Sequence, residues 1–344
     1  MGLRKDYRNL TATERTRFLT ALKKLKSNGV VGQYASMHAG HFNMSIHKSS
    51  HFLPWHREML LRFERELQKT HPDIAIPYWD SSVDQSTAGP LWASGFLGQF
   101  NSAWKLGRAL GSDILPSAQR VQSNQGQGSY DPFWRELENS IHNPPHRWVG
   151  GVMAGTASPG DPVFYLHHSW IDSLWARWQL AHPGAPFQAS GSGVGLNDGL
   201  MEWPIRTPAH VIDHHGLGYA YDWEPVRTGP RANGDDMAPE ELLGPDQSVT
   251  SANGRYSLVY QSDGNLVLYG PGGALWATGT DGKAVGVAIM QGDGNLVIYG
   301  PGNLYVWDSA TDLNYGSRLV VQNDGNTVIY RPDGAPIWAS NTVQ

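Results

Sequence analysis

Histidines at short, regular spacings are the residues of this sequence best suited to chemistry. The stretch HKSSHFLPWHRE places His47, His51 and His56 around a turn that precedes a helical pattern. Further along, His142 and His146 lie four residues apart on an expected helix, so both imidazoles project from one face and can hold one metal ion. Taken alone, such a pair is also typical of two helix histidines bonded to solvent or backbone.

Other histidines extend this pattern to two sets of three. His167 and His168 lie within DPVFYLHHSWID, and Asp172 follows one helical turn later, where its carboxylate could orient a ligand imidazole. His38 joins two histidines of the loop in the N-terminal half. The chain has no cysteine, which excludes thiolate ligands and disulfides. Neutral imidazoles without thiolates suit copper, and two facing sets in a helical bundle could hold a small diatomic molecule.

Both stretches resemble known signatures. HKSSHFLPWHREMLLRFE resembles the copper A motif of tyrosinases and catechol oxidases, DPVFYLHHSWID resembles their copper B motif, and the resemblance spans about residues 3–222. It implies two copper ions. Copper A would be held by His38, His47 and His56, and copper B by His142, His146 and His168. His51 would then be a solvated loop histidine, with His167 and Asp172 supporting the ligands. Many members have, at the position of Ser45, a cysteine that is crosslinked to a ligand histidine. In having serine there, this chain resembles the bacterial branch, where the crosslink is absent.

The same resemblance implies an oxidase that uses O2 to convert small phenols to o-quinones. Glu138 and Asn143 resemble the pair that positions a deprotonating water in members that hydroxylate monophenols, and such a base is needed because a phenol has a pKa of about 10. The alternative is a surface carboxylate beside an ordinary polar residue. Arg147 could meet a substrate carboxylate or simply be solvated. The Gly-rich loop 150–158 could admit a planar ring or be a plain turn.

Helical patterns separated by long Gly- and Pro-rich connections position these residues. The Thr11–Glu14 capping box predicts a helix that runs to about residue 28. Three more helices are expected over about 56–71, 136–146 and 166–180. Together they predict a mainly α, four-helix-bundle domain with long loops.

The C-terminal third contains a threefold repeat. After a polar segment rich in Gly, Pro and Asp, the copies QSDGNLVLY, QGDGNLVIY and QNDGNTVIY start at residues 261, 291 and 322. This period of about 30 residues indicates a repeat architecture. We therefore predict a multidomain protein with a catalytic domain at 1–225, a linker at 226–248 and a repeat domain at 249–344.

Each repeat places five residues at alternate positions, so they share one face of a strand while leucine and isoleucine point into a core. The pattern resembles the QxDxNxVxY sugar site of bulb-type, mannose-binding lectins, which implies an all-β β-prism II domain with central tryptophans. The implied sugar-binding residues are Gln261, Asp263, Asn265, Val267, Tyr269, Gln291, Asp293, Asn295, Val297, Tyr299, Gln322, Asp324, Asn326, Val328 and Tyr330. The alternative is that Asp-Gly-Asn only makes turns and the repeat is structural.

Composition limits the partners. A net charge of −5 without a basic run argues against nucleic acid, and no stretch reaches the roughly 18 apolar residues of a membrane span. The N-terminus lacks the apolar core of a signal peptide, so a cytoplasmic protein is expected, unless a partner exports it. A copper-loading chaperone is a further possible partner. The rival functions are a catechol or o-aminophenol oxidase without hydroxylase activity, a hemocyanin-like O2 carrier and a lectin with a vestigial copper domain.

Overall fold

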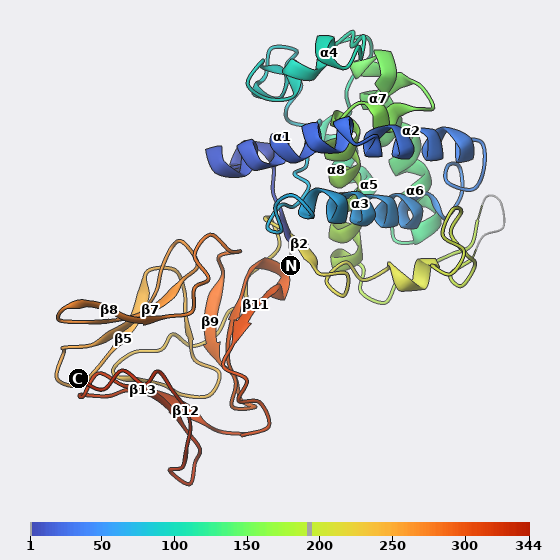
Figure 1. The fold of residues 1–344 in the computed structure, drawn as a ribbon. Coiled ribbons are helices and arrows are strands. Elements are labelled where there is room, and N and C mark those ends of the chain that lie inside the picture. The colour runs from blue at the N-terminus through green and yellow to red at the C-terminus, as the bar shows by residue number, and fades with distance from the viewer. Residues whose placement is uncertain (1, 191–194) are drawn as a thin grey trace. The chain divides into compact units, whose positions relative to one another are not determined.

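The computed structural model describes residues 2–190 and 195–344, which form two compact units. One unit is mainly helical and contains Arg4–Leu217. The other is built of β-strands and contains Gly218–Gln344 together with residues 2 and 3 (Figure 1). Within the described residues, no helix has the length and apolar character needed to cross a membrane.

The helical unit contains more helices than the four expected. They are α1 (Ala12–Ser27), α2 (Val30–His41), α3 (Phe52–Gln68), α4 (Phe100–Ala103), α5 (Ala118–Gln125), α6 (Tyr130–Glu136), α7 (Asn143–Val149) and α8 (Val163–Ala181). The capping box of α1 is confirmed, because the Thr11 side chain accepts from Glu14 N and the Glu14 carboxylate accepts from Thr11 N. The α2 and α5 helices were not predicted.

The expected helix at 136–146 is interrupted. The α6 helix ends at Glu136, a π-helical turn follows over Leu137–His142, and α7 then begins. Pro144 and Pro145 lie in the first turn of α7, where proline is tolerated because its missing N–H would have no helical partner. The chain thus changes its helical winding next to two predicted ligands, as π-turns at functional sites often do.

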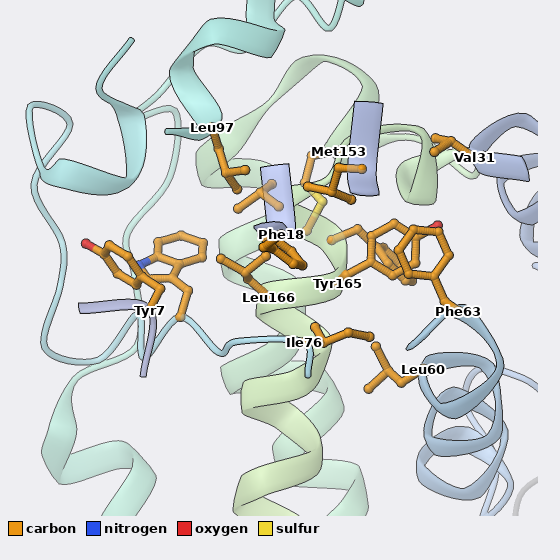
Figure 2. Close-up of a cluster of buried hydrophobic side chains, with 14 of the residues drawn as sticks. Tyr7, Phe18, Val31, Leu60, Phe63, Ile76, Leu97, Met153, Tyr165 and Leu166 are labelled. Atoms are coloured by element: carbon orange, nitrogen blue, oxygen red, sulfur yellow. The ribbon is translucent and has the colours of Figure 1, made fainter. Parts of the chain in front are cut away.

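Buried aromatic and aliphatic side chains hold the helices around α8. The Phe63 ring of α3 stacks on the Tyr165 ring of α8 with centroids 3.5 Å apart. Phe18 of α1 and Leu60 of α3 lie in the same cluster (Figure 2). Almost every side chain of α8 is buried, so α8 is the central helix of the unit and a firm support for its histidines.

Charged side chains also link these elements. Arg4 donates to Glu64 of α3 at 3.0 Å and to Asp172 of α8 at 3.1 Å, and Arg57 of α3 donates to the other Asp172 oxygen at 2.5 Å. These side chains are almost completely buried. Paired charges are the form in which a protein interior tolerates ions, so this network ties α3 to α8.

The β-unit contains three four-stranded antiparallel sheets. The first sheet contains β5 (Gln247–Thr250), β6 (Ser257–Tyr260), β7 (Leu266–Gly270) and β8 (Gly273–Ala277). The second contains β4 (Leu242–Leu243), β9 (Val287–Met290), β10 (Leu296–Tyr299) and β11 (Tyr305–Asp308). The third contains β3 (Asp236–Met237), β12 (Arg318–Val321), β13 (Thr327–Tyr330) and β14 (Pro336–Ala339). A separate short ladder joins β1 (Gly2–Arg4) to β2 (Tyr219–Tyr221).

One core joins the three sheets, as the β-prism prediction requires. Leucines and isoleucines at alternate strand positions point inward and are completely buried. The Trp276 ring lies 5.9 Å from that of Trp307 and 5.3 Å from that of Trp338. Each repeat thus supplies one tryptophan to the centre, which confirms the β-prism fold.

The segment 226–248, expected to be a linker, is part of this unit. It contains β3 and β4, which add an edge strand to the third and second sheets. Met237 and Leu243 are completely buried in the shared core. The sequence does not predict these strands, because each is only two residues long, too short to show an apolar period.

Candidate functional site

The six predicted ligands form two clusters in the helical unit. His38 comes from α2, His47 from the loop after it and His56 from the first turns of α3. The other cluster combines the π-turn, α7 and α8, and its Nε2 atoms are 3.1 Å apart for His142 and His146 and 3.2 Å apart for His142 and His168. Nitrogen atoms at such distances can share one metal ion.

The two clusters face each other. The rings of His56 and His168 are stacked with centroids 4.4 Å apart, and those of His47 and His142 are 5.8 Å apart. The two metal positions would therefore be neighbours within a single centre, as the sequence predicts.

Hydrogen bonds at Nδ1 orient five of the six imidazoles. His38 bonds to Thr156 O at 2.6 Å, His56 to Phe52 O at 2.8 Å and His146 to Met153 O at 2.8 Å. Two further bonds have side-chain acceptors: His47 to Glu138 at 3.0 Å and His142 to Asn143 at 3.0 Å. With the proton held on Nδ1, the Nε2 lone pair faces the centre, which is the usual arrangement of a metal-bound histidine.

The chemistry of this donor set fits copper. His56 Nε2 is buried and has no hydrogen-bond partner among the described residues, as expected of an atom reserved for a metal. Burial lowers the pKa of His38 to about 3 and that of His146 to about 4. These imidazoles are therefore neutral at pH 7, which is the form that binds a metal. Six imidazole nitrogen ligands without a thiolate match the preference of copper.

The structure agrees with one of three further predicted roles near the ligands, that of His167, and not with those of His51 and Asp172. His51 is not solvated but buried, with Nε2 3.0 Å from Gly195 O. The Nε2 of His167 lies 3.0 Å from His142 O, so this residue supports a ligand through its backbone. The prediction that Asp172 orients His168 is wrong. Its carboxylate accepts hydrogen bonds from Arg4 and Arg57. His168 Nδ1 lacks a hydrogen-bond partner within the described parts of the chain.

Glu138 is a buried carboxylate rather than a surface residue. Only 3% of it is exposed, and its oxygens accept from the His47 ring and, at 3.0 Å each, from the backbone N–H of Lys48. Lys48 adopts a positive φ of 53°, which is uncommon for a residue with a side chain. The sequence does not predict this backbone donor, because every residue type except proline supplies the same N–H group.

A cavity of about 730 Å³ opens over the histidines. Glu138, Asn143 and the ligands His38, His47, His142 and His146 line it, together with Phe42, Asn43, Met44, Lys48, Asn139 and Met201. Arg147 also lines it but is largely exposed and donates to Asp113, so part of its charge is already balanced. The volume lies in the usual range of small-molecule sites and is large enough to admit a substituted aromatic ring.

The loop 150–158 has two functions in this geometry. Ala154, Gly155 and Ser158 line the cavity with small side chains, as predicted. The same loop supplies the Thr156 and Met153 carbonyls that orient one histidine of each cluster. Its glycines are needed, because a Cβ at Gly151 would lie 2.2 Å from Leu106 O. One loop therefore fixes both metal positions.

The fifteen predicted sugar residues lie on the outer faces of the three sheets, on or just before β7, β10 and β13. In each copy the glutamine amide donates to the tyrosine hydroxyl, at 2.8 Å for Gln261 and Tyr269. The equivalent distances are 3.2 Å for Gln291 and Tyr299 and 2.8 Å for Gln322 and Tyr330. The polar groups are thus positioned alike three times.

Solved structures of lectins match the C-terminal region in sequence. A monomeric mannose-binding lectin from Gastrodia elata is 40% identical, covering 32% of this chain and 99% of the lectin, with a TM-score of 0.30. A Marasmius oreades lectin is 32% identical over 33% of this chain and 97% of its own, with a TM-score of 0.31. The snowdrop (Galanthus nivalis) mannose-specific agglutinin is 35% identical, covering 32% of this chain and 98% of the agglutinin, with a TM-score of 0.27.

The helical region matches the common central domain of tyrosinase at residues 28–103 and 98–181. A tyrosinase from Streptomyces antibioticus is 37% identical over 265 residues, which cover 62% of this chain and 97% of that protein. The Streptomyces glaucescens tyrosinase is 35% identical with the same coverage, and a grixazone synthase from Streptomyces griseus is 28% identical over 99% of its length. These matches include both histidine clusters, and the chain therefore belongs to the tyrosinase family.

Proposed function

We propose that this chain is a dicopper phenol oxidase that uses O2 to hydroxylate monophenols and to oxidise o-diphenols to o-quinones. The bound copper pair would take up O2 and accept electrons from the phenol. The observation that carries the hydroxylase part is Glu138, a buried carboxylate on the cavity wall next to a ligand histidine.

Monophenol hydroxylation requires a base because the phenol is protonated at neutral pH. Two carboxylate oxygens offer about four acceptor sites, and His47 and Lys48 supply only three contacts to Glu138. An acceptor position therefore remains for a water or for the phenol itself. Asn143 accepts from His142 through Oδ1, which leaves its Nδ2 group to donate toward the cavity. A water between these two residues could receive the proton.

The test is a substrate comparison with the copper-loaded protein. We expect o-quinone formation from tyrosine and from L-DOPA, with a slower rate on tyrosine. Activity on L-DOPA or o-aminophenol with none on any monophenol would reduce the proposal to a catechol or o-aminophenol oxidase. Inactivity on all three substrates would contradict both forms of it.

We further propose that the β-unit binds mannose-type sugars through its repeats. In the first copy, Asp263 Oδ1 accepts from Asn265 N, and Asn265 Oδ1 accepts from Thr278 and Thr280. These bonds leave the second aspartate oxygen available to accept from sugar hydroxyls and the asparagine Nδ2 available to donate to them. Equivalent bonds recur in the other copies.

Each such site would bind weakly, because hydroxyl bonds to a sugar replace bonds to water. Several sites that engage one branched glycan would bind it more tightly than one site, because after the first contact the other sugars are held at a high effective concentration. The test is retention of the intact protein on a mannan column and its elution by methyl α-mannoside. Passage through that column without delay would contradict sugar binding.

A further inference from the structure

The three repeats are nearly identical in sequence but differ in burial. Asn295 of the second copy is 7% exposed, whereas Asn265 and Asn326 are partly accessible. The neighbouring strands differ in the same way. Ile289, which pairs with Val297, is 3% exposed, whereas its counterparts Val259 and Val320 are partly accessible. The second outer face is therefore covered at these two positions, whereas Val297 at 2% exposure is no more buried than Val267 and Val328 at 3% each.

The cover comes from the segment just before the sheets, residues 225–242, which we call the strap. It starts at the turn after β10, where Pro225 O accepts from Gly302 N at 3.0 Å. It ends at the opposite edge of the second sheet, where Leu242 N donates to Pro230 O at 2.9 Å and β4 pairs with β9. Between these points it contacts side chains on the outer face of that sheet.

Three strap residues lie on groups of the second repeat. The Arg227 guanidinium lies 5.1 Å from the centre of the Tyr299 ring. Leu242 packs in a cluster with Val297, and Glu240 accepts from Gly292 N at 2.7 Å. The strap thus contacts the tyrosine and the valine of one repeat, two of its five predicted sugar-binding residues, and the turn beside them.

We infer that the strap closes the second sugar site, so that the β-unit binds two sugars rather than three. This inference rests on the proposed sugar binding at the repeats. The strap is part of the same chain, so its effective concentration at the site is far above that of a free monosaccharide that binds weakly. A single sugar unit therefore cannot displace it, and the open sites are those at Asp263 and Asp324.

The cover can be tested without any sugar, because the chain has no cysteine. Single variants Val259→Cys, Ile289→Cys and Val320→Cys place a thiol at the same position of each sheet. We expect the thiol at 289 to react with Ellman's reagent at least tenfold more slowly than the other two. Equal rates at the three positions would overturn the inference.

The strap can also be opened. Arg227 Nη1 is buried without a hydrogen-bond partner in the described parts of the chain, so Arg227→Ala removes the cover without breaking a bond of that atom. Glycine suits position 240, because Glu240 has a φ of +68°. The double variant Arg227→Ala/Glu240→Gly should raise the thiol reactivity of Ile289→Cys severalfold. No increase would contradict the role of the strap.

The number of sugar sites gives the second test, by calorimetric titration of the intact protein with methyl α-mannoside. We expect two sites in the natural chain and three in Arg227→Ala/Glu240→Gly. The variant Gln261→Ala/Gln322→Ala should lose all binding, because it disables both open sites. Three sites in the natural chain, or one remaining site in the glutamine variant, would overturn the inference. No binding to any form would refute sugar binding itself, while the thiol rates would still report whether the strap covers the sheet.

Discussion

At the scale of single residues, Glu138 decides between hydroxylase and oxidase. In Glu138→Gln the amide oxygen can still accept from Lys48 N, but the base is lost. We expect monophenol hydroxylation to fall by about 10² to 10⁴, the usual contribution of a general base, and diphenol oxidation to fall by less than about tenfold. Steady-state rates on tyrosine and L-DOPA at equal copper content measure this. Equal losses on both substrates would refute the selective role.

Burial of the histidines predicts a pH dependence of the metal-free protein. Their pKa values are lower in the folded chain, to about 3 for His38 and about 4 for His146, than the usual value of about 6.5 in an unfolded chain. Below pH 6.5 the unfolded state therefore binds more protons, and stability falls as the pH falls.

Each such histidine lowers the free energy of unfolding by up to about 1.4 kcal/mol for each pH unit between 6.5 and its folded pKa. Urea unfolding of the metal-free protein at pH 7.5, 6 and 5 should show little change above pH 6.5 and a steep loss below it. Bound copper should raise the stability at each pH without removing this slope, because it binds the folded state, in which the histidines are already deprotonated. A stability that does not change from pH 7.5 to pH 5 would contradict the neutral, buried histidines.

The sequence could predict the ligand residues but not what orients them. The histidine spacings and the position of Glu138 are visible in the chain itself. The carbonyls of Thr156 and Met153 are not, because any residue type supplies a backbone oxygen. His51 was expected in solvent because its loop is polar, and its buried partner, Gly195 O, is 144 residues away in the sequence.

At the scale of elements, Asp172 holds α8 to α3 and to the N-terminal strand. Asp172→Asn leaves Arg4 and Arg57 buried with less compensating charge, and breaking a buried pair in this way typically costs about 3–5 kcal/mol. Asp113→Asn is the matched control, because its pair with Arg147 is largely exposed to solvent and should contribute little to stability. Urea unfolding midpoints measure both. Equal effects of the two variants would contradict the structural role of Asp172.

Helices with a strong apolar pattern were predictable, and those without one were not. The α1 and α8 helices show clear patterns, and their bounds agree closely with the expected ones. The α2 helix buries only Val31 and His38 completely, so its sequence has little apolar periodicity. The π-turn at 137–142 was not visible either, since a change in winding leaves the composition of the segment unaltered.

At the scale of the whole molecule, the two units should act independently in catalysis. The Streptomyces antibioticus tyrosinase is matched over 97% of its length by 62% of this chain, which indicates that a unit of this size can fold alone. A chain ending after Pro225 keeps β2 and loses all three sheets. We expect its kcat on a soluble phenol to stay within about twofold of the full chain and its retention on mannan to disappear. A severalfold rise in kcat would show instead that the C-terminal region restrains the enzyme.

The most direct test of the copper assignment is a titration of the metal-free chain with copper, followed by the rate of quinone formation from a monophenol. Two clusters of three histidines that face each other predict that activity rises to a plateau at two copper ions per chain. His168→Ala, which removes one ligand, should bind about one ion tightly and form no quinone. A plateau at one copper ion per chain, or full activity of His168→Ala, would contradict the dinuclear site.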